Sequence, residues 1–542
     1  MVNHRRAFVT WIFVAWATVA HLFAWPMVSV SQETGTPAAN QDRTLRLAGP
    51  SSGLARLDPR FAPDQPTAEI LRLVFAGLVR FDADLNPVLD LAERIDVSAA
   101  GQRYTAVLRP DARFHDGRPI LAADVAASLT RSLSPGAGFP VSLSGPLFLA
   151  DIAGARDVAA GTATTLAGVS VLDDRTVLID LERPRMDFLP RLASVAAMVV
   201  DVTATVDAGL PAGPLNGSGP FRVLSWTADH ELRLGRVAPD ERGDRVTGVS
   251  YVLGPAAERP FNLYQQGLID LATVPAGSAG WVLADPVLST RVVRQPLFAV
   301  HHVAFRTDQA PLDDWYVRRA IQLAFPRRAV AEVMFGGLVD PANGLLPPDL
   351  LGPFPGTALP PPDLAAARDA IGRSRYGTAA AVPPIEIVTH ADQAVESLRD
   401  VLQRDLGLRV TVLSLPWPDF LAGLAGASFP AHGLLWIADY PSPDALLWTL
   451  FGSDSPANAT GYRNPAFDAA IEAARQAPDV ATRDAHYARA HAHLVADAVI
   501  LPTYHPVDYL LVHPRLDNVT LTPLGLLAVD AIEVEPLPVV VG

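Results

Sequence analysis

The chain has 542 residues, 49% of them hydrophobic and 18% charged, so it is long enough for two or more globular domains. Its formal charge of −14 at pH 7 disfavours binding to nucleic acid or to an anionic lipid surface. Cysteine and lysine are both absent from the sequence, which excludes disulfides, thiolate nucleophiles, Cys-based metal sites and the lysines of P-loops and Schiff-base enzymes.

The N-terminus has the pattern of a secretory signal. Two arginines precede an apolar run over residues 7–25, and small residues allow cleavage after Ser31. We therefore predict a signal peptide over 1–31, a flexible leader over 32–43, and a periplasmic or extracytoplasmic protein. An uncleaved membrane anchor is the alternative, because the run approaches the ~20 residues that span a bilayer. Without a cysteine, a lipoprotein anchor is not expected.

The rest of the chain alternates between patterns typical of strands and of helices. A strand at 385–389, a helix at 394–406 and a strand at 409–414 predict a βαβ unit, and several hairpins are also predicted, so we expect α/β lobes with mixed sheets. Other strands are predicted at 44–48, 104–109, 169–181 (two), 221–226, 231–236, 300–306, 433–438, 509–512 and 531–534. Other helices are predicted at 68–78, 122–133, 315–325, from Pro326 onward, 467–473 and 483–496.

The segment 433–450, GLLWIADYPSPDALLWTL, is the most informative part of the sequence. A strand-like apolar run ends at Asp439, which lies close to two aromatic residues, Trp436 and Tyr440. Carboxylates at the carboxyl end of a strand often contact ligands in α/β folds. We therefore predict substrate-binding roles for Asp439, Trp436 and Tyr440.

A helix is predicted directly after these residues. Ser442 is expected as its N-cap, with Pro443 at the first helical position and Asp444 in the first turn, where the helix dipole favours an anion. Gly452 is expected to end the helix. Because other residues account for the cap, Asp439 is not required for it.

Two other patterns suggest a hydrolase and a metal site, but the surrounding sequence favours a structural role for both. Residues 49–53, GPSSG, match the G-x-S-x-G pattern of a hydrolase elbow, but the prolines that follow predict a loop instead of the required helix. A serine hydrolase acting through Ser51 or Ser52 therefore remains only as a distant alternative. The histidines of 483–496 lack the spacing needed to share one metal ion on a helix. We predict no catalytic residue, cofactor or metal.

Five blocks in a fixed order resemble a known family. They are FAGLV with LDLAE at 75–93, YTAVLRPDARFHDGRPILAADVAASLTR at 104–131, GSGPF at 217–221, the block 305–337, and IADYPSP at 437–443. Together they are similar to the extracytoplasmic solute-binding proteins of peptide-type (dipeptide, oligopeptide and nickel) ABC transporters, solute-binding protein family 5. Two departures stand out: Leu121 replaces the usual helix-capping Thr or Ser, at a cost of about 1 kcal/mol unless compensated, and Ser442 replaces an acidic residue.

The resemblance implies an α/β, two-lobed periplasmic binding protein fold (type II, cluster C), with an extra subdomain in the first lobe. It implies a first lobe over 44–300 with the subdomain at about 70–200, a second lobe over 301–507, and a C-terminal return to the first lobe over 508–542. The chain is expected to cross between lobes near 296–301 and 505–509.

The resemblance also implies a function without bond breaking. A peptide-like solute would be captured between the lobes and delivered to an ABC permease, by a protein that we expect to be a monomer. At the position of Asp439 the family uses a carboxylate to hold the peptide's α-ammonium group, and the position of Trp436 lines the binding site. The alternative ligands for the same fold are a nickel–metallophore chelate, haem or an oligosaccharide.

Overall fold

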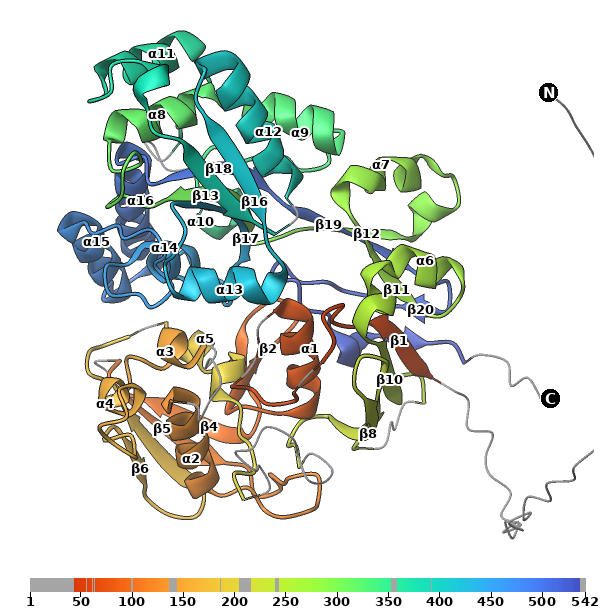
Figure 1. Ribbon diagram of the computed structural model, residues 1–542. Coiled ribbons are helices and arrows are strands. Elements are labelled where there is room, and N and C mark those ends of the chain that lie inside the picture. Colours follow the sequence, from red (N-terminus) through yellow and green to blue (C-terminus); the bar gives the residue numbers. More distant parts are fainter. Residues whose placement is uncertain are drawn as a thin grey trace, which may run out of the picture. The chain divides into compact units, whose positions relative to one another are not determined.

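Two α/β lobes make up the part of the chain that the computed structural model describes, and two strand crossings join them (Figure 1). The described residues are 43–536, except 55, 61, 63, 99–100, 136–143, 186, 204–215, 239–242, 352–357 and 391. The predicted signal peptide and all of the predicted leader but its last residue lie outside them. Among the described helices, none combines the length and apolarity needed to cross a bilayer.

The first lobe contains a four-stranded sheet in the order β1-β10-β9-β8 and a three-stranded sheet in the order β11-β19-β12. The strands are β1 (Thr44–Ala48), β8 (Phe221–Thr227), β9 (Glu231–Arg236), β10 (Gly248–Val252), β11 (Leu271–Val274), β12 (Val292–Pro296) and β19 (Val507–Val512). The predicted hairpin of β8 and β9 is confirmed, because the two strands pair antiparallel.

Helix α1 (Gln65–Val74) of the first lobe differs from its prediction at both ends. It begins earlier, because the Asp64 side chain accepts a hydrogen bond from the Thr67 N–H at 2.9 Å and Pro66 fits the first turn. It ends at Val74, after which Phe75 is extended. The prolines of this region predict a loop, whereas Pro66 lies inside the helix.

A subdomain of the first lobe contains the antiparallel sheet β4-β5-β7-β6. It consists of β4 (Ala92–Val97), β5 (Arg103–Leu108), β6 (Val169–Val171), β7 (Thr176–Asp180), α2 (Ala122–Leu133), α3 (Ser144–Phe148), α4 (Ala155–Ala159) and α5 (Phe188–Arg191). The missing cap of α2 is compensated: the Asp124 carboxylate accepts a hydrogen bond from the Leu121 N–H at 2.8 Å.

The second lobe has a six-stranded mixed sheet in the order β14-β18-β13-β17-β15-β16. The strands are β13 (Ala299–Phe305), β14 (Asp340–Pro341), β15 (Ile385–Thr389), β16 (Val410–Ser414), β17 (Ala431–Ile437) and β18 (Ile500–His505). The predicted βαβ unit is confirmed, because β15 and β16 pair parallel on either side of α12 (Gln393–Val401). A π-helical segment, Leu402–Leu406, extends α12 to the predicted end.

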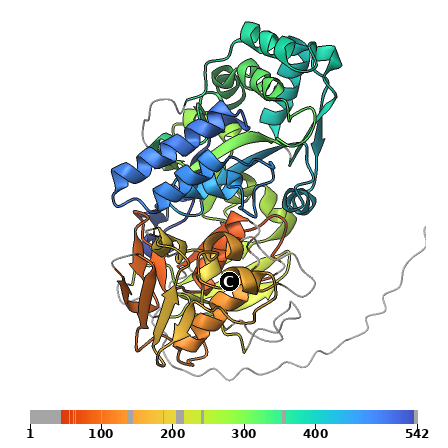
Figure 2. The same cartoon turned by 90° about the vertical axis from the view of Figure 1, so that its left-hand side faces the viewer.

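Helices cover this sheet, and three of them lie next to the subdomain in both views (Figures 1 and 2). These three are α14 (Asp444–Phe451), α15 (Pro465–Arg475) and α16 (Val480–Ala496); the others include α8 (Trp315–Ala324), α9 (Arg327–Phe335), α11 (Leu364–Arg373) and α13 (Trp417–Ala425). One apolar core contains residues of both the subdomain and the second lobe, among them Phe148 and Tyr440.

The two crossings between the lobes lie side by side. Strand β12 ends at Pro296 and β13 begins at Ala299, while β18 ends at His505 and β19 begins at Val507. Pro296 is paired with Val507 in the antiparallel ladder of β12 and β19. These two neighbouring connections carry the chain from one lobe to the other.

Candidate functional site

The segment after β17 carries the predicted site residues. β17 lies between β13 and β15, and the Ala438 N–H still donates to the Phe298 carbonyl at 2.8 Å. The regular strand then ends, and Asp439 and Tyr440 follow in a bend before α14. A central strand of the sheet therefore fixes the point from which the Asp439 side chain extends.

The Asp439 carboxylate is incompletely paired. Its Oδ2 is inaccessible to solvent and has no hydrogen-bond partner among the described residues. Burial raises the pKa of this carboxyl to about 7, and the positive charge of Arg72 partly opposes the rise. A buried carboxylate oxygen without a donor is uncommon in native proteins and requires an explanation.

Arg72 approaches Asp439 from the other lobe. It lies in α1, where its Nη1 donates to the Ala193 carbonyl at 2.7 Å, while its buried Nε has no partner within the described residues. Burial lowers the pKa of Arg72 to about 10, although the charges of Asp439 and Glu69 favour its protonated form. Asp439 of the second lobe and Arg72 of the first lobe therefore shift each other's pKa. Each has one buried hydrogen-bonding atom, Oδ2 and Nε respectively, that is without a partner among the described residues.

Two more carboxyls lie in this region of the first lobe. Glu69 is on α1, one helical turn before Arg72, and its Oε1 accepts a hydrogen bond from the Leu527 N–H at 3.1 Å. Burial raises the pKa of Glu69 to about 7 and that of Asp508, on β19, to about 6. Neither residue is marked by a motif in the sequence, because its burial results from chain segments that are far apart in the sequence.

Trp436 is the last residue but one of β17 and lies opposite Val300 of β13. It is partly buried and packs against two apolar clusters, the core shared by the subdomain and the second lobe and a smaller cluster within the second lobe. Its indole Nε1 is buried without an acceptor among the described residues. This position is compatible with a side chain that contributes to the core and presents one polar atom to a ligand. Its predicted ligand contact stays a prediction.

Tyr440 points into the protein and is only 2% exposed. Its hydroxyl donates to the Asp444 carboxylate at 2.8 Å. Its ring forms an edge contact with Phe148 of the subdomain, with 6.0 Å between ring centroids. The hydroxyl is therefore engaged within the protein, and the predicted contact of Tyr440 with a ligand also stays a prediction.

Asp444 has a larger role than the predicted dipole effect. Its N–H donates to the Ser442 Oγ at 3.3 Å, and α14 ends before Gly452 as predicted. Its carboxylate, however, is fully buried and accepts hydrogen bonds from Arg475 at 2.8 and 2.9 Å and from Arg191 of the subdomain at 2.7 Å. Burial alone would raise the pKa of Asp444, but the two arginines outweigh it and hold the pKa below the usual range.

The patterns that suggested catalysis or metal binding have structural explanations. Ser51 and Ser52 are exposed in a turn, and in the described part of this segment no helix begins before Gln65. His491 accepts a hydrogen bond from the Leu345 N–H at 2.8 Å. His301 is buried against Asp392 and Thr503. The described residues contain no group of three His, Cys, Asp or Glu side chains suited to a metal ion.

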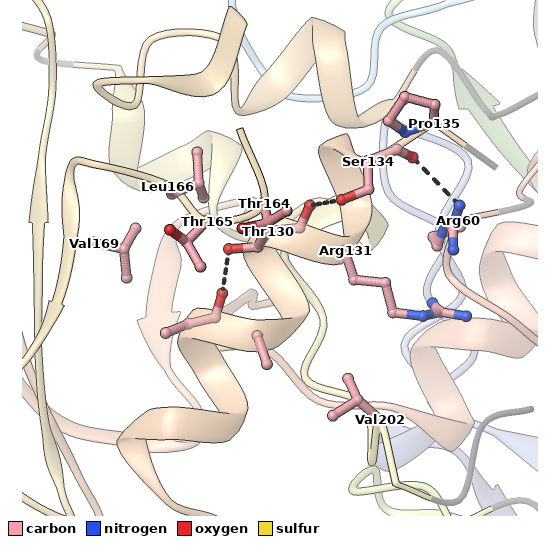
Figure 3. A pocket seen from close by; sticks show the side chains of 12 residues that line it. Arg60, Thr130, Arg131, Ser134, Pro135, Thr164, Thr165, Leu166, Val169 and Val202 are labelled. Atoms are coloured by element: carbon pink, nitrogen blue, oxygen red, sulfur yellow. Dashed lines mark hydrogen bonds between the residues drawn. The ribbon is translucent and has the colours of Figure 1, made fainter. Parts of the chain in front are cut away.

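A cavity of about 610 Å³ lies apart from these residues, on the subdomain between α2 and the segment 164–169 (Figure 3). Its arginines are engaged by the protein: Arg131 forms two hydrogen bonds with Asp58, at 2.7 and 2.5 Å, and Arg60 donates to the Ser134 carbonyl at 3.3 Å. The cavity therefore offers mostly hydroxyl and aliphatic groups, and it shares no lining residue with the Asp439 region.

Comparison with known proteins gives one consistent result. Residues 86–458 match the model of the bacterial extracellular solute-binding proteins, family 5. The chain is 27% identical over 513 residues to the probable deoxycholate-binding periplasmic protein YgiS of Escherichia coli, covering 92% of this chain and 94% of that protein. It is 26% identical over 506 residues to the periplasmic oligopeptide-binding protein OppA of the same species, covering 90% and 91%.

Solved structures share the fold at lower sequence identity. The murein tripeptide binding protein MppA of Escherichia coli superimposes with a TM-score of 0.79 at 23% identity, covering 92% of this chain and 99% of that one. Haemophilus influenzae OppA in complex with the peptide RPPGFSPFR gives a TM-score of 0.78 at 16% identity, covering 91% and 99%. The two-lobed α/β fold is therefore shared along nearly the whole chain.

Proposed function

The chain belongs to the bacterial extracellular solute-binding proteins of family 5, and from this premise we propose that it captures a peptide-like solute between its lobes for an ABC importer. The relatives include periplasmic oligopeptide-binding proteins, matched over nine-tenths of their length. The expected location is periplasmic or extracytoplasmic, reached through the predicted signal. The protein would bind as a monomer and release the solute to a membrane permease, without an enzymatic step.

One observation supports this proposal above the others: the unpartnered, buried Oδ2 of Asp439 at the end of β17. An ammonium group on the ligand would donate a charge-assisted hydrogen bond to this atom and neutralise a carboxylate that burial makes costly to ionise. Such a contact selects ligands with a free amino terminus, since a neutral amide would leave the carboxylate uncompensated.

Arg72 adds a second requirement for the ligand. Its Nε is also buried without a partner in the described part of the chain. A ligand that carries an acceptor near its ammonium group, such as the first peptide carbonyl, would satisfy both Asp439 and Arg72. A purely cationic ligand would satisfy Asp439 alone and be repelled by the guanidinium.

The proposal is tested by a thermal-shift screen of the purified protein against di- to pentapeptides, their N-acetylated forms, metal chelates and deoxycholate. Free peptides should raise the melting temperature, and N-acetylation or the substitution Asp439→Asn should abolish the shift. Asp454→Asn, at an exposed position of the same lobe, is the matched control and should keep it.

Equal shifts with free and acetylated peptides would contradict the role of Asp439. A shift with deoxycholate alone would contradict the peptide proposal. That result would favour an anionic ligand, which Arg72 could bind and which a charged Asp439 would repel.

A further inference from the structure

The two lobes also meet through charged side chains at a second place, next to Tyr440. We call this contact the interlobe seam. It consists of Arg183, Arg185 and Arg191 on the first lobe and of Asp444, Glu472 and Arg475 on the second. Both ribbon views show the corresponding elements, α5 below and α14 to α16 above, facing each other (Figures 1 and 2).

Arg191 is the buried centre of the seam. It is 1% exposed and contacts three carboxylates, with nitrogen–oxygen distances of 2.9 Å to Asp151, 3.0 Å to Asp187 and 2.7 Å to Asp444. The first two carboxylates belong to its own lobe. The third belongs to the other lobe, 253 positions along the chain, and is itself completely buried.

Each lobe keeps its own charges paired if the lobes move apart. Asp444 retains Arg475, and Arg191 retains Asp151 and Asp187. Arg185 and Glu472 also meet across the seam, at 3.5 Å, but Glu472 is 27% exposed. Both partners of the Arg191–Asp444 bond are buried, and this bond exists only while the lobes touch. Hydrogen bonds between charged partners are among the stronger ones in proteins, particularly where water is excluded.

Tyr440 links the seam to the candidate ligand site. Its hydroxyl and Arg191 donate to the same oxygen, Oδ2 of Asp444, and the Arg191 guanidinium carbon lies 5.4 Å from the centre of the Tyr440 ring. Tyr440 directly follows Asp439 in the chain. A side chain from the first lobe therefore helps to hold the backbone from which the Asp439 carboxylate extends.

We propose that Arg191 is a latch residue: its bond to Asp444 stabilises the contact between the lobes independently of a ligand and positions Asp439 for binding. The latch rests on the proposed function in one respect: capture of a solute between the lobes requires that the lobes open and close. It does not rest on the identity of the ligand. Closure would then have two contributions, one from the ligand at Asp439 and one from the protein at Asp444.

The latch is tested in the ligand-free, full-length protein by measuring the distance between two spin labels. The chain has no cysteine, so Leu172→Cys on the subdomain and Val480→Cys on the second lobe provide the two label sites. These positions are 58% and 60% exposed, so labels there leave the core intact. The labelled protein should show a short-distance and a long-distance population.

Arg191→Met should lower the ratio of short-distance to long-distance populations about tenfold or more. Asp444→Asn should act in the same direction from the other lobe and keeps nearly the same side-chain volume. Arg183→Met is the matched control: this arginine crosses the same seam to Glu472 at 3.6 Å, but it is 66% exposed, and its loss should leave the ratio unchanged.

An unchanged ratio in both Arg191→Met and Asp444→Asn would overturn the latch, as would an equal effect of Arg183→Met. Unfolding of both variants would also overturn it, because the pair would then be required by the separate lobes. Opening of Arg191→Met without any peptide binding by the wild type would leave the latch intact and contradict the peptide proposal, so the two failures are distinguishable.

Discussion

Replacing Asp439 by Asn should make the protein more stable than the wild type at alkaline pH. In the folded protein the pKa of Asp439 is raised from 3.8 to about 7. Between these values the folded state holds a proton that the unfolded chain has released, so this carboxyl reduces stability as the pH rises through the window. Asn has no proton to release and does not contribute this loss.

The expected size follows from the shift. Of the rise in pKa, about two units lie above pH 5, which corresponds to at most about 3 kcal/mol between pH 5 and pH 8. The side chain is not completely buried, and Arg72 loses a neighbouring negative charge in the variant. We therefore expect the advantage of Asp439→Asn over the wild type to grow by about 1 to 2 kcal/mol over this range.

Urea unfolding at pH 5 and pH 8, at 25 °C, measures this difference. The other carboxyls with raised pKa, Glu69 and Asp508, are present in both proteins and cancel. Asp454→Asn, at an exposed site, should have the same free energy of unfolding as the wild type at both pH values. A variant whose free energy of unfolding keeps a constant offset from the wild type would refute the incompletely paired state of Asp439.

Three further outcomes follow from the same region. The affinity for a peptide with a free amino terminus should fall about tenfold for each pH unit below about 7, because Asp439 becomes protonated there. Calorimetric titrations at pH 5.5, 6.5 and 8 measure this fall. An affinity that does not change with pH would argue against the ammonium contact. Arg72→Met removes the cation that lowers the pKa of Asp439, so the same affinity profile should move to higher pH, and an unmoved midpoint would show that Arg72 is not coupled to the site. Gly433→Ala should destabilise the protein by about 1–3 kcal/mol, since a Cβ on this β17 residue would lie 2.3 Å from the Val395 Cγ2, whereas Gly372→Ala, where nothing lies within 4 Å, should not; thermal melts compare the two.

Local signals in the sequence were sufficient for most elements of the fold. The βαβ unit around α12 was predictable because β-branched strands and an amphipathic helix follow one another within 30 residues. The start of α8 was predictable from its capping aspartates, of which Asp314 is the one that accepts the Tyr316 N–H, at 2.9 Å. The local rule fails at α1, where proline predicts a loop although Pro66 is compatible with the first helical turn.

The pairing of charges could not be predicted in the same way. Asp444 was expected to interact with the dipole of its own helix, but its partners include Arg191, 253 positions away. No local signal marks Arg72, because an arginine in an amphipathic helix is ordinarily solvated and the neighbouring Asp439 lies in the other lobe. Contacts of this kind depend on how the lobes meet, which no local periodicity encodes.

Asp439 and Asp444 occupy the same short segment, yet their surroundings raise the pKa of the first and lower the pKa of the second. Asp444 is matched by Arg475 of its own lobe and Arg191 of the other, so its charge is stabilised and its hydrogen-bonding capacity is used. Asp439 faces one arginine without a direct hydrogen bond to Oδ2, so its charge remains costly. A carboxylate that already has its donors gains little from a ligand cation, whereas one that lacks a donor gains a full charge-assisted bond. Under the two proposals made above, Asp444 would hold the lobes together through Arg191 while Asp439 exchanges ligands, because the donors that Asp444 uses are not those that Asp439 lacks.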